Sequence, residues 1–196
     1  MNASPSGENR RAAWAVAGLV LLAFALRLYR LEAPALRGDE SFTVLFVTQP
    51  LAEMWDGIRN IEPNPPLYYL LLRAALWLWG ASDWAARFSS AWFGVLAVPL
   101  IYRLGRALTA GQRRGEGHAR GEWAPLLAAL LLAINPYQIW HSQDVRNYTL
   151  WPALSLASLC FLVQALRQPR GRPWLRAGYV LTALLSLYSH YYDAFS

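Results

Sequence analysis

The stretch Ala12–Leu31, AAWAVAGLVLLAFALRLYRL, decides the fold class, because its 20 residues are long and apolar enough to cross a lipid bilayer as a helix. A short polar segment, residues 1–11, precedes it and ends in Arg10 and Arg11. The run is too long for the core of an ordinary signal peptide, and no small-residue cleavage pattern follows it. We therefore predict an uncleaved transmembrane helix with residues 1–11 in the cytoplasm.

The composition extends this prediction to the whole chain. Of its 196 residues 56% are apolar and 14% aromatic, and the mean hydropathy is +0.20. Open sheets cannot cross lipid, and the apolar runs lack the alternation typical of a β-barrel. We predict an all-α integral membrane protein, a polytopic bundle of about five transmembrane helices. The predicted spans cover 12–31, 88–108, 123–140, 148–166 and 174–192.

The basic residues indicate how the chain is oriented. All 18 are arginines, and the formal net charge is +6. A basic chain often binds nucleic acid, but these arginines fall in short loops between apolar runs, which is the positive-inside pattern, so we predict no nucleic-acid partner. Arg27 and Arg30, near the far end of the first span, are expected to reach the lipid headgroups. Two cytoplasmic loops are marked by Arg103, Arg106, Arg113, Arg114 and Arg120, and by Arg167, Arg170, Arg172 and Arg176.

The first outer loop is predicted to cover residues 32–87. Residues 32–64 contain six acids but only two arginines, which places them outside the cytoplasm. Residues 65–80, PPLYYLLLRAALWLWG, are apolar but short, and a central charge such as that of Arg73 costs ~2.5–3.5 kcal/mol at mid-bilayer. We therefore predict that they lie along the interface or against the bundle.

Within residues 42–58 apolar side chains recur at roughly helical spacing on a polar background. An amphipathic helix in the membrane interface explains this pattern, and a small packed cap explains it equally well. The residues concerned are Phe42, Leu45, Phe46, Leu51, Met54, Trp55 and Ile58.

With this topology three polar segments share the outer face: Asp39–Glu40, Ser142–Asn147 and His190–Asp193. One carboxylate can take a proton from an acceptor hydroxyl, a second can hold a divalent cation, and an arginine can neutralise a leaving phosphate. Two simpler readings stay open, namely a surface ion pair of Asp144 with Arg146 and an interfacial histidine at His190. The single cysteine, Cys160, permits no intrachain disulfide.

An ordered set of motifs resembles a known family. The set resembles the amino-terminal part of GT-C membrane glycosyltransferases of the family-39-like type, the protein-mannosyltransferase and aminoarabinose-transferase enzymes. The motifs are RGDES (37–41), NPPLYYLLL (64–72), WAARFSSAWFGVLAVPLIYRLGR (84–106), LLLAINPYQIWHSQDVRNYTL (130–150) and LLSLYSHYYDAF (184–195).

The resemblance implies a reaction. A sugar carried on a polyprenyl phosphate is transferred to an acceptor lipid, glycan or protein, with inversion at the anomeric carbon. The resemblance places this reaction on the extracytoplasmic side of the cell inner membrane. Residues 12–192 then form the amino-terminal transmembrane module, with the remainder of the family fold absent, so the chain is expected to be a fragment. Whether this polypeptide alone is active is left open.

The resemblance also assigns roles. Asp39 and Glu40 match the first-loop acidic motif, whose aspartate acts as base or orients the acceptor. The residue before the two prolines, often His or Lys in such enzymes, is Asn64 here. We group Asn64, Asp144, Arg146 and Tyr148 as the donor-phosphate and substrate-binding residues. A divalent cation of unknown identity is expected on Asp39, Asp144 and His190.

A rival prediction is a transporter or lipid-binding membrane protein that uses the same outer cavity without bond chemistry. Transporters tend to bury charges at the bilayer midplane and to contain internal repeats. The predicted spans are uncharged at their middles and no repeat is found, which favours the transferase.

Overall fold

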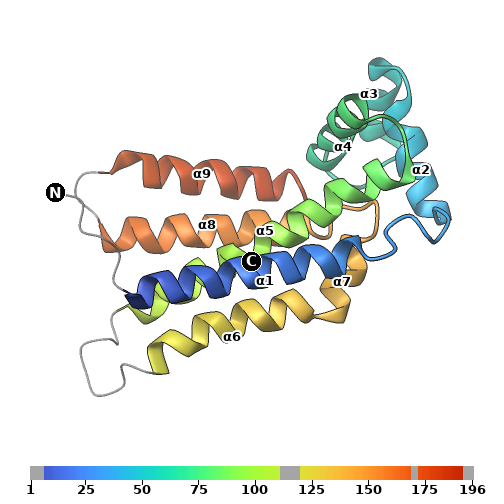
Figure 1. The fold of residues 1–196 in the computed structure, drawn as a ribbon. Coiled ribbons are helices and arrows are strands. Elements are labelled where there is room, and N and C mark those ends of the chain that lie inside the picture. Colours follow the sequence, from blue (N-terminus) through green and yellow to red (C-terminus); the bar gives the residue numbers. More distant parts are fainter. Residues whose placement is uncertain (1–6, 111–119, 169–171, 192–196) are drawn as a thin grey trace.

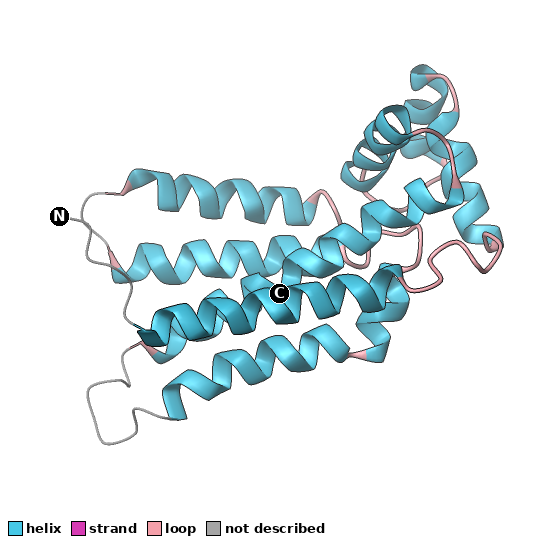
Figure 2. Ribbon diagram, in the orientation of Figure 1, coloured by secondary structure: helices cyan, strands magenta, loops and turns pink. Residues whose placement is uncertain are grey.

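The computed structural model describes residues 7–110, 120–168 and 172–191, and within these ranges it contains helices joined by loops and no strand (Figure 2). The all-α prediction is therefore confirmed. Three arginines predicted in cytoplasmic loops, Arg113, Arg114 and Arg170, lie outside the described ranges, and so does Asp193 of the third polar segment. The helices are α1 Gly7–Leu28, α2 Gly38–Thr48, α3 Leu51–Asn60, α4 Leu67–Trp79, α5 Asp83–Thr109, α6 Arg120–Ile134, α7 Pro136–Ser142, α8 Leu150–Arg167 and α9 Pro173–Leu187.

Five helices, α1, α5, α6, α8 and α9, lie side by side as a bundle with α5 at its centre (Figure 1). Helix α5 begins at an N-cap, where the Ser82 hydroxyl accepts the Ala85 N–H at 3.2 Å, and it runs for 27 residues. Because α5 packs against α1, α6 and α8, it joins segments that are far apart in the sequence.

The lengths of these helices agree with a multi-pass membrane protein. Among the described residues, three helices are long and apolar enough to cross a bilayer, Asn9–Leu28, Asp83–Thr109 and Leu150–Arg167. Helices α6 and α7 make a fourth if the bent pair counts as one span. The fifth predicted span corresponds to α9, which has 15 residues and packs along α8.

The predicted span 123–140 is not one continuous helix. It breaks at Asn135, and α7 leaves α6 at 55°. Pro136 has no N–H for α6 and begins α7 at its first turn, while the Asn135 side chain accepts the Gln138 N–H at 3.1 Å. The break turns the chain across the end of the bundle, and the loop after Ser142 starts from there.

Helices α2, α3 and α4 form a cap at the end of the bundle where α5 begins (Figure 1). Phe46 and Met54 are buried in one cluster with Tyr69 and Leu72 of α4, as expected for a packed cap. Part of the apolar pattern stays on the surface, as expected for an interfacial helix; the exposed members are Phe42, Leu45 and Leu51.

Arg73 explains why α4 lies in the cap and not among the spans. Its guanidinium donates to the carbonyl oxygens of Val47 at 2.5 Å and of Gln49 at 2.6 Å. Carbonyls at a helix C-terminus lack partners within the helix, and a cation there interacts favourably with the helix dipole. The positive charge of Arg73, which makes a transmembrane position of α4 unfavourable, therefore binds α4 to the end of α2.

Arg27 does not reach the headgroups as the sequence predicts. Its side chain is fully buried, with 0% exposure, between α1, α5 and the α6–α7 break. A guanidinium can be buried when carbonyl and hydroxyl oxygens accept its N–H groups, and Arg27 has such acceptors. Arg30, three residues on, is exposed.

Candidate functional site

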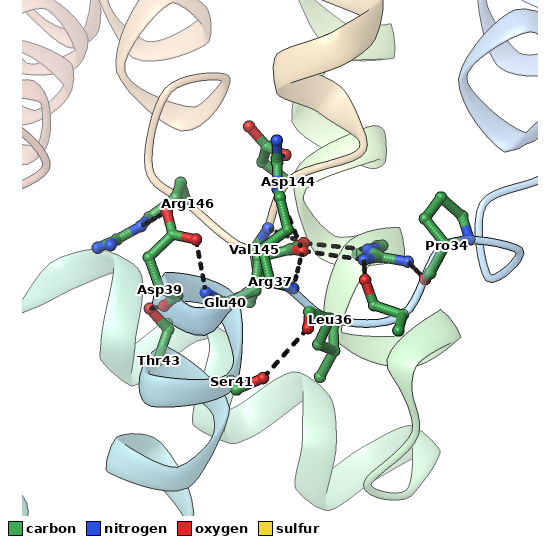
Figure 3. Close-up of polar contacts among 12 residues, drawn as sticks. Pro34, Leu36, Arg37, Asp39, Glu40, Ser41, Thr43, Asp144, Val145 and Arg146 are labelled. Carbon is green, nitrogen blue, oxygen red and sulfur yellow. Dashed lines mark hydrogen bonds and ion pairs between the residues drawn. The ribbon is translucent and has the colours of Figure 1, made fainter.

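The first two predicted polar segments meet where the cap joins the bundle (Figure 3). Arg146 Nε donates to Asp39 Oδ2 at 3.3 Å, and the Arg37 guanidinium contacts the Asp144 carboxylate. The pairs are therefore crossed, since Asp39 binds the arginine that follows Val145, and Asp144 binds the arginine that precedes α2. The local ion pair of Asp144 with Arg146 does not form, because the two side chains point to different partners.

Glu40 is the most enclosed carboxylate of the site, with 1% of its surface exposed. Arg87 Nε and Nη2 donate to its two oxygens at 3.0 and 2.9 Å. The backbone N–H groups of Arg37 at 2.9 Å and Val145 at 3.2 Å donate to the same carboxylate. Glu40 thus ties the start of α2, helix α5 and the second loop together.

Asp39 differs from its neighbour, because 53% of its side chain is exposed. Desolvation alone would raise the pKa of the Asp39 carboxyl, but the charge and hydrogen bond of Arg146, with backbone N–H donors, outweigh it and lower the pKa. Asp39 is consequently an accessible carboxylate that is ionised at neutral pH.

The pKa of Glu40 predicts how stability depends on pH. Burial alone would raise this pKa, but hydrogen bonds from Arg87, Arg37 N–H and Val145 N–H, with the charge of Arg87, lower it from 4.5. A lowered folded-state pKa contributes stability that is complete above about pH 4.5 and is lost as the pH falls through the folded pKa. Thermal unfolding in detergent from pH 7 to pH 3 should show this loss, and Glu40→Gln should reduce it. An unchanged pH profile in Glu40→Gln would contradict the assignment.

Val145 fixes the two side chains on either side of it. It is 0% exposed and belongs to the apolar cluster of the cap, and burying a valine contributes about 1.5 kcal/mol or more. With Val145 anchored, Asp144 and Arg146 lie at the junction with the cap. Ser90 of α5 adds a second anchor, because its hydroxyl donates to the Arg146 carbonyl at 3.2 Å.

Aromatic rings enclose Asp144 on the α7 side. His141 Nδ1 lies 3.4 Å from Asp144 Oδ2, and the His141 ring packs 4.6 Å from that of Tyr148, which is 41% exposed. The Arg37 guanidinium lies 5.3 Å from the Trp140 ring centroid. Tyr148, predicted to bind the donor phosphate or the substrate, therefore belongs to the group of aromatic rings beside Asp144.

Asn64 lies beside the site at the start of α4. Its side chain donates to Glu62 Oε1 at 2.5 Å, and both residues hydrogen-bond the Tyr69 hydroxyl. Burial, followed by the hydrogen bond and charge of Glu62, raises the pKa of Tyr69, while Asn64 and the charge of Arg146 act in the opposite direction. Asn64 contacts Glu62 and Tyr69 but none of Asp39, Asp144 and Arg146, so the structure does not join this predicted residue directly to the site.

The third polar segment borders the site through Asn147, whose side-chain N–H donates to the Ser189 carbonyl at 2.6 Å. The His190 ring stacks on Trp151 at 4.8 Å. Among the residues that the structure describes, no group of three or more His, Cys, Asp or Glu side chains is placed to hold a metal ion. Asp39, Asp144 and His190 do not fit the predicted cation, because arginines neutralise both carboxylates. The cation remains a prediction.

A cavity of about 150 Å³ lies behind the ion pairs and is lined by Arg37, Glu40, Arg87, Trp140 and Asp144. A wider hollow of about 540 Å³ adjoins it beside Tyr29 and Arg30, with Pro34 and Gln143 lining both. Space for a ligand therefore exists next to the guanidinium groups of Arg37 and Arg87, while Asp39 and Arg146 line neither hollow.

Two arginines of the site, Arg87 and Arg37, were not predicted from the sequence as site residues. Arg87 lies one residue before the predicted span at 88, where a lone charge beside an apolar run signals a buried partner. Arg37 gave no such signal, since it reads as an ordinary loop arginine.

One comparison with known proteins gives a match. The sequence profile of the dolichyl-phosphate-mannose-protein mannosyltransferase family matches residues 63–194. No curated protein and no solved structure matches the chain. The profile covers α4 to α9, including the loop with Asp144 and Arg146.

Proposed function

Because the chain belongs to the dolichyl-phosphate-mannose-protein mannosyltransferase family, which makes it a membrane glycosyltransferase of the GT-C type, we propose that it uses a polyprenyl-phosphate-linked sugar as its donor. The acceptor in this proposal is a hydroxyl group of a lipid, glycan or protein. The observation that carries it is the pairing of an exposed carboxylate, Asp39, with a guanidinium, Arg146, at 3.3 Å.

The two groups have complementary tasks in the proposed reaction. Asp39 accepts the proton of the acceptor hydroxyl while the oxygen of that hydroxyl forms a bond to the anomeric carbon. The bond from that carbon to the phosphate oxygen breaks, and its electron pair leaves with the polyprenyl phosphate. Arg146 faces the charge that develops on the phosphate. A single displacement of this kind inverts the anomeric carbon.

The resting ion pair sets the order of events. An exposed ion pair contributes only about 0–1 kcal/mol, so a phosphate displaces the Asp39 carboxylate from Arg146 at little cost. Binding of the donor thereby frees the base for the acceptor. Arg37, which binds Asp144, lines the neighbouring cavity of about 150 Å³, and in this proposal it is a second guanidinium available to the phosphate.

Glu40 acts as a positioning residue in this proposal. Its four hydrogen bonds with Arg87, Arg37 N–H and Val145 N–H occupy the lone pairs that a base needs. It fixes the start of α2, and hence Asp39, against the second loop.

The arginine distribution supports an extracytoplasmic site. Helices α1 and α9 begin, and α5 and α8 end, at the opposite end of the bundle from the cap (Figure 1). By the positive-inside rule that end faces the cytoplasm. The arginines at or near those helix ends include Arg10, Arg11, Arg103, Arg106, Arg167, Arg172 and Arg176.

The proposal is tested by the release of labelled sugar from polyprenyl phosphate by the purified protein, with Arg146→Gln as the variant. A charge-assisted hydrogen bond contributes about 1.5–3 kcal/mol, so kcat/KM for the donor should fall by roughly 10- to 100-fold. Arg59→Gln, an exposed arginine on α3, serves as the control.

Two results would contradict the proposal. One is an Arg146→Gln variant that transfers sugar as fast as the Arg59→Gln control. The other is movement of intact lipid-linked sugar across the bilayer without release of polyprenyl phosphate, which would support the transporter.

A further inference from the structure

We infer that Arg27, a residue of the first transmembrane helix, is a positioning residue that sets the α6–α7 bend and thereby places Asp144 and Arg146. The inference rests on the proposed function for the roles of those two residues. Its structural part stands on the contacts of Arg27 alone.

The Arg27 guanidinium holds both sides of the bend. On the α6 side, Nη1 donates to the Ala133 carbonyl at 3.0 Å and Nη2 to the Leu132 carbonyl at 3.2 Å. On the α7 side, Nε donates to Ser142 Oγ at 3.1 Å. The broken helix leaves carbonyls of its last turn without intrahelical partners, and Arg27 supplies donors to two of them.

A reciprocal contact fastens the loop back to α1. The Gln143 side-chain N–H donates to the carbonyls of Arg27 at 3.2 Å and Tyr29 at 3.0 Å. The end of α1 therefore binds Ser142 and Gln143 from both directions. Asp144 follows directly, so a shift of the bend is transmitted to the ion pair with Arg37.

Helix α5 leaves space for this arrangement at Gly94. A Cβ atom there would overlap Ser142 Oγ and lie 2.9 Å from Arg27 Nε. The glycine is therefore required by the close approach of three segments, α1, α5 and the end of α7. This requirement gives a second, independent way to test the contact.

The direct test measures the bend. Spin labels are placed on the exposed positions Leu127 of α6 and Tyr137 of α7, in the protein with Cys160 replaced by alanine. Arg27→Gln should broaden or shift the distance distribution between the labels. Arg11→Gln is the matched control, because Arg11 is an exposed arginine of the same helix. Identical distributions in Arg27→Gln and Arg11→Gln would overturn the inference.

The functional arm measures binding of polyprenyl phosphate in nanodiscs and the kinetics of transfer. A displacement of about 1 Å far from the chemistry can cost on the order of 100-fold in rate, so Arg27→Gln should weaken binding and lower kcat by up to that factor. Arg27→Lys should not restore either value, because a lysine lacks the planar fork of donors. A shifted bend with unchanged binding of polyprenyl phosphate would overturn the positioning role. Absence of transfer in the parent protein, with Arg27-dependent binding, would refute the proposed function but not this inference.

A double-mutant cycle covers the case in which Arg27→Gln fails to fold. Gly94→Ala should lower the apparent melting temperature through the overlap with Ser142 Oγ, and Ser142→Ala should relieve part of that loss. An equal loss in both backgrounds would show that Gly94 and Ser142 are not in contact, which would overturn the close approach that the inference requires.

Discussion

Replacing Asp39 by asparagine should lower the rate of sugar transfer by roughly 100- to 10,000-fold, the contribution of a positioned general base. Asparagine has the same shape but cannot take the acceptor proton. More than half of the Asp39 side chain is exposed, so the protein should fold and insert normally. The measurement is single-turnover release of labelled sugar from polyprenyl phosphate by the purified protein.

The matched control is Glu53→Gln, which neutralises an exposed acid of α3 in the same cap. Its rate should equal that of the parent. If Asp39→Asn left the rate within about threefold, a difference of under 1 kcal/mol in barrier, Asp39 would not be the base.

Replacing Glu40 by alanine should destabilise the protein by about 3–5 kcal/mol, because it leaves the guanidinium of Arg87 buried without its counter-charge. Both side chains are nearly inaccessible, at 1% for Glu40 and 3% for Arg87. Thermal unfolding in detergent measures the effect, and Glu53→Gln again serves as the control.

The cause of that loss is separable. In the double variant Glu40→Ala with Arg87→Met, no charge remains buried at this contact, so the loss should be smaller than the sum of the single losses by about 0.5–3 kcal/mol. It should not vanish, since Arg37 N–H and Val145 N–H would still lose their acceptor. Strictly additive losses would mean that the ion pair has no energetic role.

Run lengths and arginine positions were sufficient to predict the bundle and to place two polar segments together. The contacts of Asp39 with Arg146 and of Arg37 with Asp144 join residues 107 positions apart in the chain. No local pattern specifies such a distance, but a topology does, because every second loop of a bundle emerges at the same end. The number of membrane crossings between two loops is enough to tell whether they lie at the same end.

The roles within the site were not predictable in the same way. Adjacent residues of a helix point about 100° apart, so Asp39 and Glu40 look equivalent in the sequence although one faces solvent and the other the interior. The prediction for Arg27 was wrong because the sequence did not show the break between α6 and α7 at Asn135. That break provides carbonyl oxygens inside the bundle, and these accept the N–H groups of Arg27 in place of the lipid headgroups.

The ion pairs leave the site electrically balanced, because three carboxylates, Asp39, Glu40 and Asp144, face three guanidinium groups. Arg146 pairs with Asp39, Arg87 with Glu40, and Arg37 with Asp144 and, at 3.7 Å, also with Glu40. Under the proposed function such a site exerts little long-range pull on an anion, so a lipid-linked donor would reach it by lateral diffusion in the bilayer.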